Sequence, residues 1–150
     1  MTLILLKFCY WIIGIAMFFK RSQLRDFLKH LTDNYTILKL ENWDSQNGII
    51  LRHDVDLDVS CAFEMAQIEA EYQAFGTYLF MTTHPSYNVS MLDNRRKLRE
   101  MSDMGFEIGL HFDPLIYGDV DNTVMKSQVD FEATVLSNIT GKEVRSISIH

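Results

Sequence analysis

Hydrophobic residues recur with the spacing of an amphipathic helix near the start of the globular part of the chain. Leu24, Phe27, Leu28 and Leu31 occupy positions i, i+3, i+4 and i+7, so one face of a helix here would be apolar. Ser22 precedes this pattern and is one of the residue types that favour the N-cap position. The pattern therefore predicts a helix that begins at Ser22.

Shorter apolar segments predict β-strands, and helical patterns separate most of them. The predicted strands cover residues 35–40, 49–52, 77–82, 106–112 and 144–150. Alternation of strand and helix is typical of parallel strands joined by right-handed crossovers, either in an α/β barrel or in a doubly wound sheet. In both architectures the functional groups gather beyond the C-terminal ends of the strands.

The predicted helices between these strands have recognisable ends and buried faces. Asp58 or Ser60 can cap the first of them, and Ser90 with Asp93 has the pattern of a capping box at the start of the second. The second and third helices are expected to bury apolar residues, namely Leu98, Met101, Val124, Phe131 and Val135.

The composition is that of a globular protein with a sizeable core. The chain has 150 residues, of which 47% are hydrophobic and 23% charged. Its formal net charge of -6, without a long basic run, argues against a nucleic-acid partner, because phosphate binding requires clustered lysine and arginine. Cys9 and Cys61 lie in unlike contexts and suggest neither a disulfide framework nor a cysteine-based zinc site.

The first 19 residues form a largely apolar segment, and Lys20 and Arg21 follow it. If this segment is translated, it is just long enough for a membrane anchor, and the basic residues after it would leave the rest of the chain in the cytoplasm. If translation instead starts at Met17, the segment is a misassigned start and the protein is cytoplasmic. Residues 20–150 form the expected catalytic domain under either reading.

An apolar strand runs directly into a cluster of carboxylates at residues 52–56, with the sequence Arg-His-Asp-Val-Asp. If strand geometry persists, Asp54 and Asp56 point to the same side, because the side-chain period of a strand is two. Two neighbouring carboxylates repel each other unless they share a cation or a proton. We therefore expect a divalent metal here, with one carboxylate as a ligand and the other as a base.

A second polar cluster ends the predicted strand at residues 106–112. His111 lies at the C-terminal end of this strand, beside Asp113. A neutral imidazole in such a position is a suitable ligand for zinc or another first-row metal. Since parallel strands end at the same rim, we expect His111 to approach Asp56.

Together these motifs resemble those of the polysaccharide deacetylase family, also called the NodB-homology or carbohydrate esterase 4 group. The resemblance covers about residues 22–150 and is closest to a branch with Arg-His-Asp-Val-Asp at residues 52–56 and Glu-Ile-Gly-Leu-His-Phe-Asp at residues 107–113. It implies a distorted (β/α) barrel, of which this truncated chain would contain the N-terminal half. It also implies hydrolysis of the amide or ester bonds of N- or O-acetylated sugars or polysaccharides.

The resemblance further implies roles for single residues. Asp54 would be the general base, and Asp56 and His111 would bind a divalent metal, with zinc expected. Where the family has a further histidine, this chain has Leu115, which leaves the third protein ligand open. Additional ligands or substrate contacts are expected among Asp113, His84 and His150. The later family motifs, with an arginine that orients the base and a histidine that acts as the acid, would lie beyond residue 150.

Two alternative functions remain open at this point. Asp54 and Asp56 after an apolar strand also resemble the Asp-x-Asp nucleophile motif of haloacid-dehalogenase-type phosphatases, and Thr82 ends the next strand as their second motif requires. That alternative gives His111 no role. A carbohydrate-binding pseudoenzyme is the other alternative, and Leu115 is the feature that favours it.

Overall fold

The computed structural model describes residues 21–44 and 47–150. The apolar segment predicted as an anchor or a misassigned start lies outside the described residues. Among the helices of the described ranges, none is both long and apolar enough to cross a membrane.

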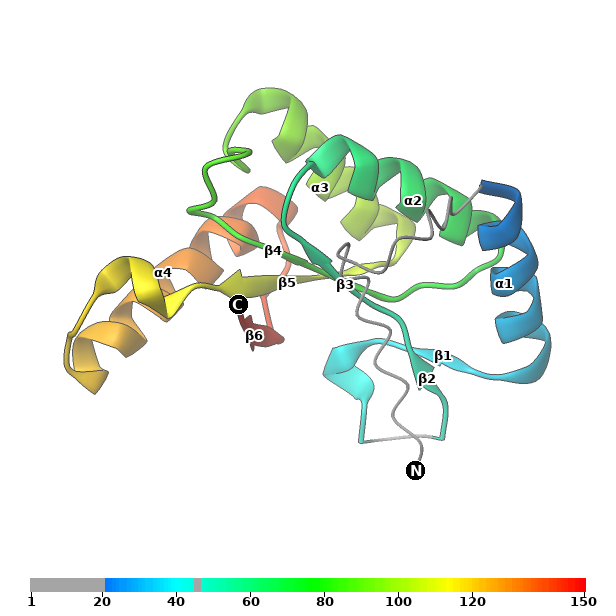
Figure 1. Ribbon diagram of the computed structural model, residues 1–150, viewed down its shortest axis with the longest axis horizontal. Helices are drawn as coiled ribbons and strands as arrows, with labels where there is room; N and C mark the ends of the chain where they lie inside the picture. The colour runs from blue at the N-terminus through cyan, green and yellow to red at the C-terminus, as the bar shows by residue number, and fades with distance from the viewer. Residues whose placement is uncertain (1–20, 45–46) are drawn as a thin grey trace, which may run out of the picture.

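A four-stranded parallel sheet forms the centre of the fold (Figure 1). Its strands follow one another in chain order, namely β3 (Arg52–Val55), β4 (Thr77–Phe80), β5 (Glu107–Phe112) and β6 (Ile147–Ile149). A doubly wound sheet would reverse its strand order at a switch point, and this sheet does not. The α/β prediction is confirmed, and the sequential order identifies the sheet as part of a (β/α) barrel.

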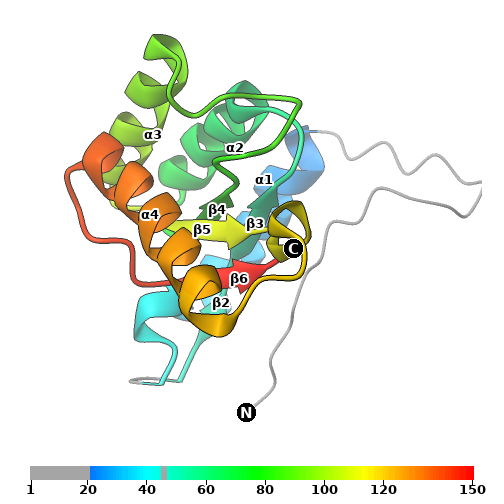
Figure 2. The same ribbon diagram turned by 90° about the vertical axis from the view of Figure 1, so that its left-hand side faces the viewer.

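Three helices cover the same side of this sheet (Figure 2). They are α2 (Val59–Glu71), α3 (Leu92–Met104) and α4 (Asn122–Thr140). One-sided covering agrees with the barrel interpretation, because in such barrels the helices form the outer layer and the other face of the sheet lines the interior.

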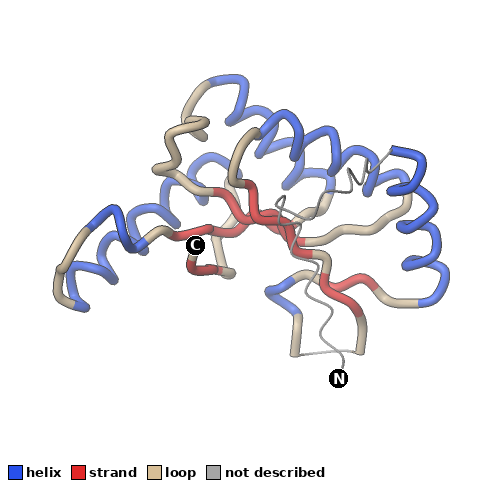
Figure 3. The backbone as a smooth tube through the Cα atoms, in the orientation of Figure 1, coloured by secondary structure: helices blue, strands red, loops and turns tan. Residues whose placement is uncertain are grey.

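A smaller parallel pair precedes the main sheet. Helix α1 (Arg21–Asn34) leads into β1 (Ile37–Leu38), the 3₁₀ turn η1 (Leu40–Asn42) and then β2 (Ile49–Ile50), which pairs with β1. Figure 3 shows these two strands to one side of the four-stranded sheet. Since the helix already includes Ser22, the prediction of Ser22 as its N-cap is wrong.

The strand predicted at residues 49–52 is divided between two sheets. β2 pairs with β1, whereas the Leu51 carbonyl accepts a hydrogen bond from Thr77 N (2.8 Å) and β3 pairs with β4. The chain therefore changes partner at Leu51. As a result, residues 52–55 of the Arg-His-Asp-Val-Asp segment form strand β3, and Asp56 is the residue that follows the strand.

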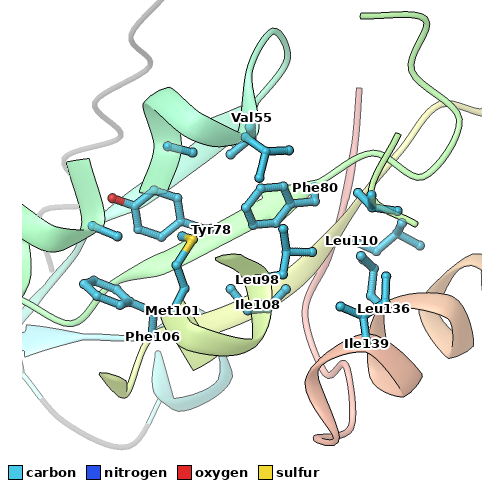
Figure 4. Packing of buried hydrophobic residues seen from close by; sticks show 14 of the residues in the cluster. Val55, Tyr78, Phe80, Leu98, Met101, Phe106, Ile108, Leu110, Leu136 and Ile139 are labelled. Atoms are coloured by element: carbon cyan, nitrogen blue, oxygen red, sulfur yellow. The ribbon is translucent and has the colours of Figure 1, made fainter. Parts of the chain in front are cut away.

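The hydrophobic core lies between the sheet and the covering helices (Figure 4). Phe80 of β4 and Leu110 of β5 belong to one buried cluster with Leu98 and Met101 of α3 and Leu136 of α4. All of these side chains are fully buried. The predicted inward face of α3 is confirmed.

The helix starts agree only partly with the prediction. Asp58 is the N-cap of α2, and its Oδ1 accepts a hydrogen bond from Ser60 N (2.6 Å). The capping box predicted at Ser90 is wrong, because Met91 occupies the N-cap of α3 without a side-chain bond. Asn88 Oδ1 accepts a hydrogen bond from Ser90 N (2.8 Å) instead, so residues 88–90 form a turn that precedes the helix.

The predicted buried face of α4 is wrong for two of its three residues, whereas Val135 is partly buried and packs against the core. Val124 and Phe131 are exposed by 40% and 65%, whereas Glu132 is fully buried. The Glu132 carboxylate accepts hydrogen bonds from the hydroxyls of Tyr117 and Thr82. A buried carboxyl group in the middle of the helix interrupts the apolar stripe, so hydrophobic spacing alone indicates the wrong face.

Helix α4 begins at the N-cap Asp121, whose Oδ1 accepts from Thr123 N (2.7 Å) and Val124 N (2.9 Å). The bonds from Val124 and Thr123 lower the pKa of Asp121 in the folded protein. We expect Asp121→Asn to lower the melting temperature at neutral pH, since the charged form stabilises the folded state. This stabilisation is present above the unfolded-state pKa of about 3.9 and disappears as the pH falls through the lower folded-state pKa. Calorimetry of both proteins at decreasing pH checks this, and a pH-independent difference would contradict it.

Gly109 lies where β5 approaches its neighbours closely. A Cβ atom there would be 2.5 Å from Leu79 Cδ2 and 2.7 Å from the backbone oxygen of Ser146. Since the Ser146 oxygen also accepts from Leu110 N, backbone between β5 and β6 would have to move. We expect Gly109→Ala to lower the free energy of unfolding by about 1–3 kcal/mol in urea denaturation. An unchanged denaturation midpoint would show that the backbone next to β6 can move to accommodate the added methyl group without loss of stability.

Candidate metal centre and base

Three strands of the main sheet bring potential metal ligands to one rim. Asp56 directly follows β3, His111 lies in β5, and His150 directly follows β6. The His111 Nε2 atom lies 3.5 Å from Asp56 Oδ1, and His150 Nδ1 lies 3.9 Å from the same oxygen. The two imidazole nitrogens are 3.0 Å apart. The predicted approach of His111 to Asp56 is present in the structure.

These donor atoms fit a divalent ion. Asp56 Oδ1 is buried and has no hydrogen-bond partner among the described residues, although it faces both imidazoles. Ligand atoms around a tetrahedral zinc lie roughly 3.3 Å apart, close to the three separations observed here. One carboxylate and two imidazoles also form a donor set that suits zinc and other first-row metals.

The protonation state of His111 agrees with such a role. Its side chain is 4% exposed. Burial lowers the pKa of His111, while the negative charges of Asp54 and Asp56 oppose this effect. The imidazole is therefore neutral at pH 7, which is the form that binds a metal.

Asp54 lies on the same face of β3 as Arg52, since the two residues are separated by one strand period. Arg52 Nε donates to Asp54 Oδ1 (2.8 Å), and Arg52 Nη2 donates to Asp54 Oδ2 (3.0 Å). The side chains are only 23% and 20% exposed. Arg52 Nη2 also donates to the Ser148 hydroxyl on β6. Arg52 belongs to the predicted motif, but its pairing with Asp54 was not predicted, although the spacing of the two residues could have indicated it.

The intervening residue of β3 points to the opposite side. His53 Nε2 lies 2.8 Å from Glu69 Oε1 of α2, and the Tyr78 hydroxyl donates to Glu69 Oε2 (2.8 Å). This buried group connects β3 and β4 to the covering helix. His53 is therefore part of the packing behind the site.

The other sequence-predicted residues lie outside the three-residue cluster. His84 is partly exposed, and its Nδ1 accepts from Ser86 N (3.2 Å). Asp113 caps the 3₁₀ turn η2 (Pro114–Tyr117) by accepting from Leu115 N (2.9 Å). Leu115 itself is 84% exposed. Of the three additional candidates, His150 is the one that the structure places with Asp56 and His111.

Tyr87 is a further residue of this rim, and the sequence indicated no chemical role for it. Its hydroxyl donates to the Val55 carbonyl (2.5 Å) and accepts from Met81 N (2.9 Å). The loop after β4 is thereby attached to the C-terminal end of β3, immediately before Asp56. These two hydrogen bonds restrict the movement of the backbone next to Asp56, which carries the carboxylate of the cluster.

No protein-family model matches the chain, and no curated protein matches its sequence. Among solved structures, the chain is similar to the Streptococcus pyogenes deacetylase PplD, which was determined in complex with acetate. The TM-score is 0.66 at 14% sequence identity, and the match covers 85% of this chain and 61% of PplD. The chain thus has the fold of a deacetylase over most of its length and spans less than two thirds of that protein.

Proposed function

We propose that this chain carries the metal ligands and the general base of a divalent-metal-dependent deacetylase of the polysaccharide deacetylase family. The expected substrates are N- or O-acetylated sugars. The observation that carries the proposal is the convergence of Asp56, His111 and His150 beside Asp54, at the rim where barrel enzymes place their active sites. The fold shared with a deacetylase supports it.

Asp56, His111 and His150 would hold the ion through the three atoms that face one another. A bound divalent ion supplies a Lewis acid that polarises a carbonyl group and lowers the pKa of water. Burial of His111 and the attachment of the neighbouring loop by Tyr87 preorganise these ligands, which limits the reorganisation needed for binding.

Asp54 would accept a proton from the attacking water. A carboxylate has about four lone-pair sites, and the two bonds from Arg52 occupy only two of them. The remaining sites can receive the proton as the water oxygen attacks the acetyl carbon. The bond from carbon to the sugar nitrogen or oxygen would then break, acetate would leave, and the sugar amine or hydroxyl would take up the proton that the water gave to Asp54, which regenerates the carboxylate.

The test is a metal titration combined with an acetate-release assay. The intact protein is stripped with a chelator and reloaded with zinc, cobalt or magnesium, and acetate is measured from N-acetylated and O-acetylated oligosaccharides. We expect release to require zinc or another first-row metal and to saturate near one ion per chain. Stoichiometric metal binding without release from any acetylated sugar would favour the pseudoenzyme.

The phosphatase alternative gains no support from the site. The Thr82 hydroxyl donates to the buried Glu132 carboxylate, and Asp54 is held by Arg52. A phosphatase of this type forms a covalent phosphoaspartate, whereas the proposed deacetylase forms no covalent intermediate. Trapping of a phosphorylated Asp54 would overturn the proposal.

A further inference from the structure

We propose that the turn η2 is a contact surface for the sugar residues next to the acetylated one. Leu115 and Ile116 are its contact residues, and Glu132 is the positioning residue that holds the turn from behind. This inference rests on the proposed function and deepens it, because it names an acetylated oligosaccharide rather than a monosaccharide as the substrate. Its basis is a pair of exposed apolar side chains on a turn that a buried carboxylate anchors at the rim.

The turn begins close to two of the proposed metal ligands. Strand β5 ends one residue after His111, and Asp113, the N-cap of η2, follows the strand. The Phe112 carbonyl, which leads into the turn, accepts a hydrogen bond from His150 N (2.8 Å). A substrate whose acetyl group reaches the three-residue cluster therefore lies beside this turn.

Three contacts fix the conformation of the turn. Asp113 Oδ1 accepts from Leu115 N, which closes its first residues. The Tyr117 ring stacks on the buried ring of Phe112, with centroids 5.7 Å apart and an interplanar angle of 14°. The Tyr117 hydroxyl donates to Glu132 Oε1 (2.5 Å). A surface held in this way loses little conformational entropy when a ligand binds.

Glu132 also connects the turn to the neighbouring loop. Its Oε2 atom accepts from the Thr82 hydroxyl, and the preceding residue, Met81, donates through its backbone N to the Tyr87 hydroxyl. Since Tyr87 donates in turn to the Val55 carbonyl, hydrogen bonds connect the end of β3 with η2. Burial of a carboxylate is costly, and an apolar residue of similar volume often stabilises a core more. Stability alone therefore does not account for Glu132.

Leu115 and Ile116 are exposed although the turn that carries them is fixed. Their exposed fractions are 84% and 49%, whereas the proposed ligand His111 is 4% exposed. An acetyl group has to enter the rim to reach His111, while the exposed pair lies where the rest of the substrate remains outside. Aliphatic side chains pack well on the C–H faces of sugar rings. The pair thus suits sugar residues beyond the acetylated one.

The first experiment substitutes the more exposed contact residue in the intact, metal-loaded protein. The probes are N-acetylglucosamine and its linear tetramer, and the O-acetylated forms of glucose and its linear tetramer. We expect Leu115→Ser to raise KM for the tetramers by roughly 5- to 20-fold through the loss of apolar contact. KM for the monosaccharides and kcat for all substrates should stay close to the wild-type values.

Leu92→Ser is the matched control, because Leu92 is also a highly exposed leucine, at 82%. It begins α3, whose first turn lies apart from the segment after β5 in Figures 1 and 2. This variant should keep every KM. A KM for the tetramers that is the same in Leu115→Ser as in the wild type would overturn the contact role.

Tyr117→Phe tests the positioning by Glu132, since it keeps the aromatic ring and removes the hydrogen bond. We expect KM for the tetramers to rise by roughly 3- to 10-fold, with kcat and metal content unchanged and with faster hydrogen exchange of the η2 amides. Tyr78→Phe is the matched control, because the Tyr78 hydroxyl also donates to a buried glutamate of a covering helix, Glu69 (2.8 Å). It should lower stability without changing KM. Changes in KM that follow the loss of stability in both variants would overturn the positioning role.

Failure of the proposed function is recognised separately. If the wild type releases no acetate, calorimetry measures binding of the same tetramers. Weaker binding by Leu115→Ser than by the wild type would support the contact surface in a protein that is not a deacetylase. Equal affinities, or no binding of any tetramer, would overturn the inference. Acetate release with unchanged KM in Leu115→Ser would overturn the inference alone and leave the proposed function standing.

Discussion

Asp54→Asn is expected to abolish acetate release while the metal content stays close to that of the wild type. The amide cannot accept the proton of the attacking water, and loss of a general base typically lowers the rate by about 10²- to 10⁴-fold. Asp54 is held by Arg52 and is not one of the three residues whose donor atoms converge. Acetate release and metal analysis on the same sample check both halves of this expectation.

Asp121→Asn is the matched control, because it makes the same chemical change at the N-cap of α4, away from the rim. It should keep the rate of acetate release. Loss of metal from Asp54→Asn would show that Asp54 is a ligand and that the roles assigned to Asp54 and Asp56 are exchanged.

His111→Ala is expected to remove metal and activity together. The imidazole is nearly fully buried and its Nε2 is the donor closest to both other proposed ligands, so its loss would leave two of the three proposed ligands. We expect the affinity for zinc to fall by roughly 100-fold or more, since even residues that only support ligands change affinity by 10- to 100-fold. Asp56→Ala and His150→Ala should behave in the same way.

His84→Ala serves as the control for this series, because His84 lies outside the cluster and bonds to the nearby Ser86 backbone. Its metal content should match the wild type. Full zinc occupancy in His111→Ala, measured after dialysis against a weak chelator, would remove His111 from the set of ligands.

The sequence predicted the parts of the fold that depend on local patterns. Alternating strands and helices indicated a parallel α/β sheet, and the periods of β3 and β5 placed Asp54, Asp56 and His111 at one rim. The buried face of α4 could not be predicted, because Glu132 is buried by partners at Thr82 and Tyr117 that are distant in sequence. Tertiary contacts determine which face of such a helix is buried, and hydrophobic spacing along the sequence contains no information about these contacts.

The third ligand candidate illustrates another limit of the sequence. His84, Asp113 and His150 all carry side chains that can bind a metal, and the choice among them depends on strand register. His111 pairs with Ser148, and His150 lies one strand period further on the same face. The 3₁₀ turn that Asp113 caps likewise could not be predicted from the sequence and is known only from the structure.

The bond between Arg52 and Ser148 joins residues 96 positions apart in the chain. During synthesis, β3, β4 and β5 can pair as they leave the ribosome, because each contact among neighbouring strands closes a shorter loop. A nascent chain that has not yet delivered β6 has most of its core, but it lacks both the hydroxyl that holds Arg52 and the imidazole of His150. The candidate metal-binding cluster is thus complete only when β6 is in place.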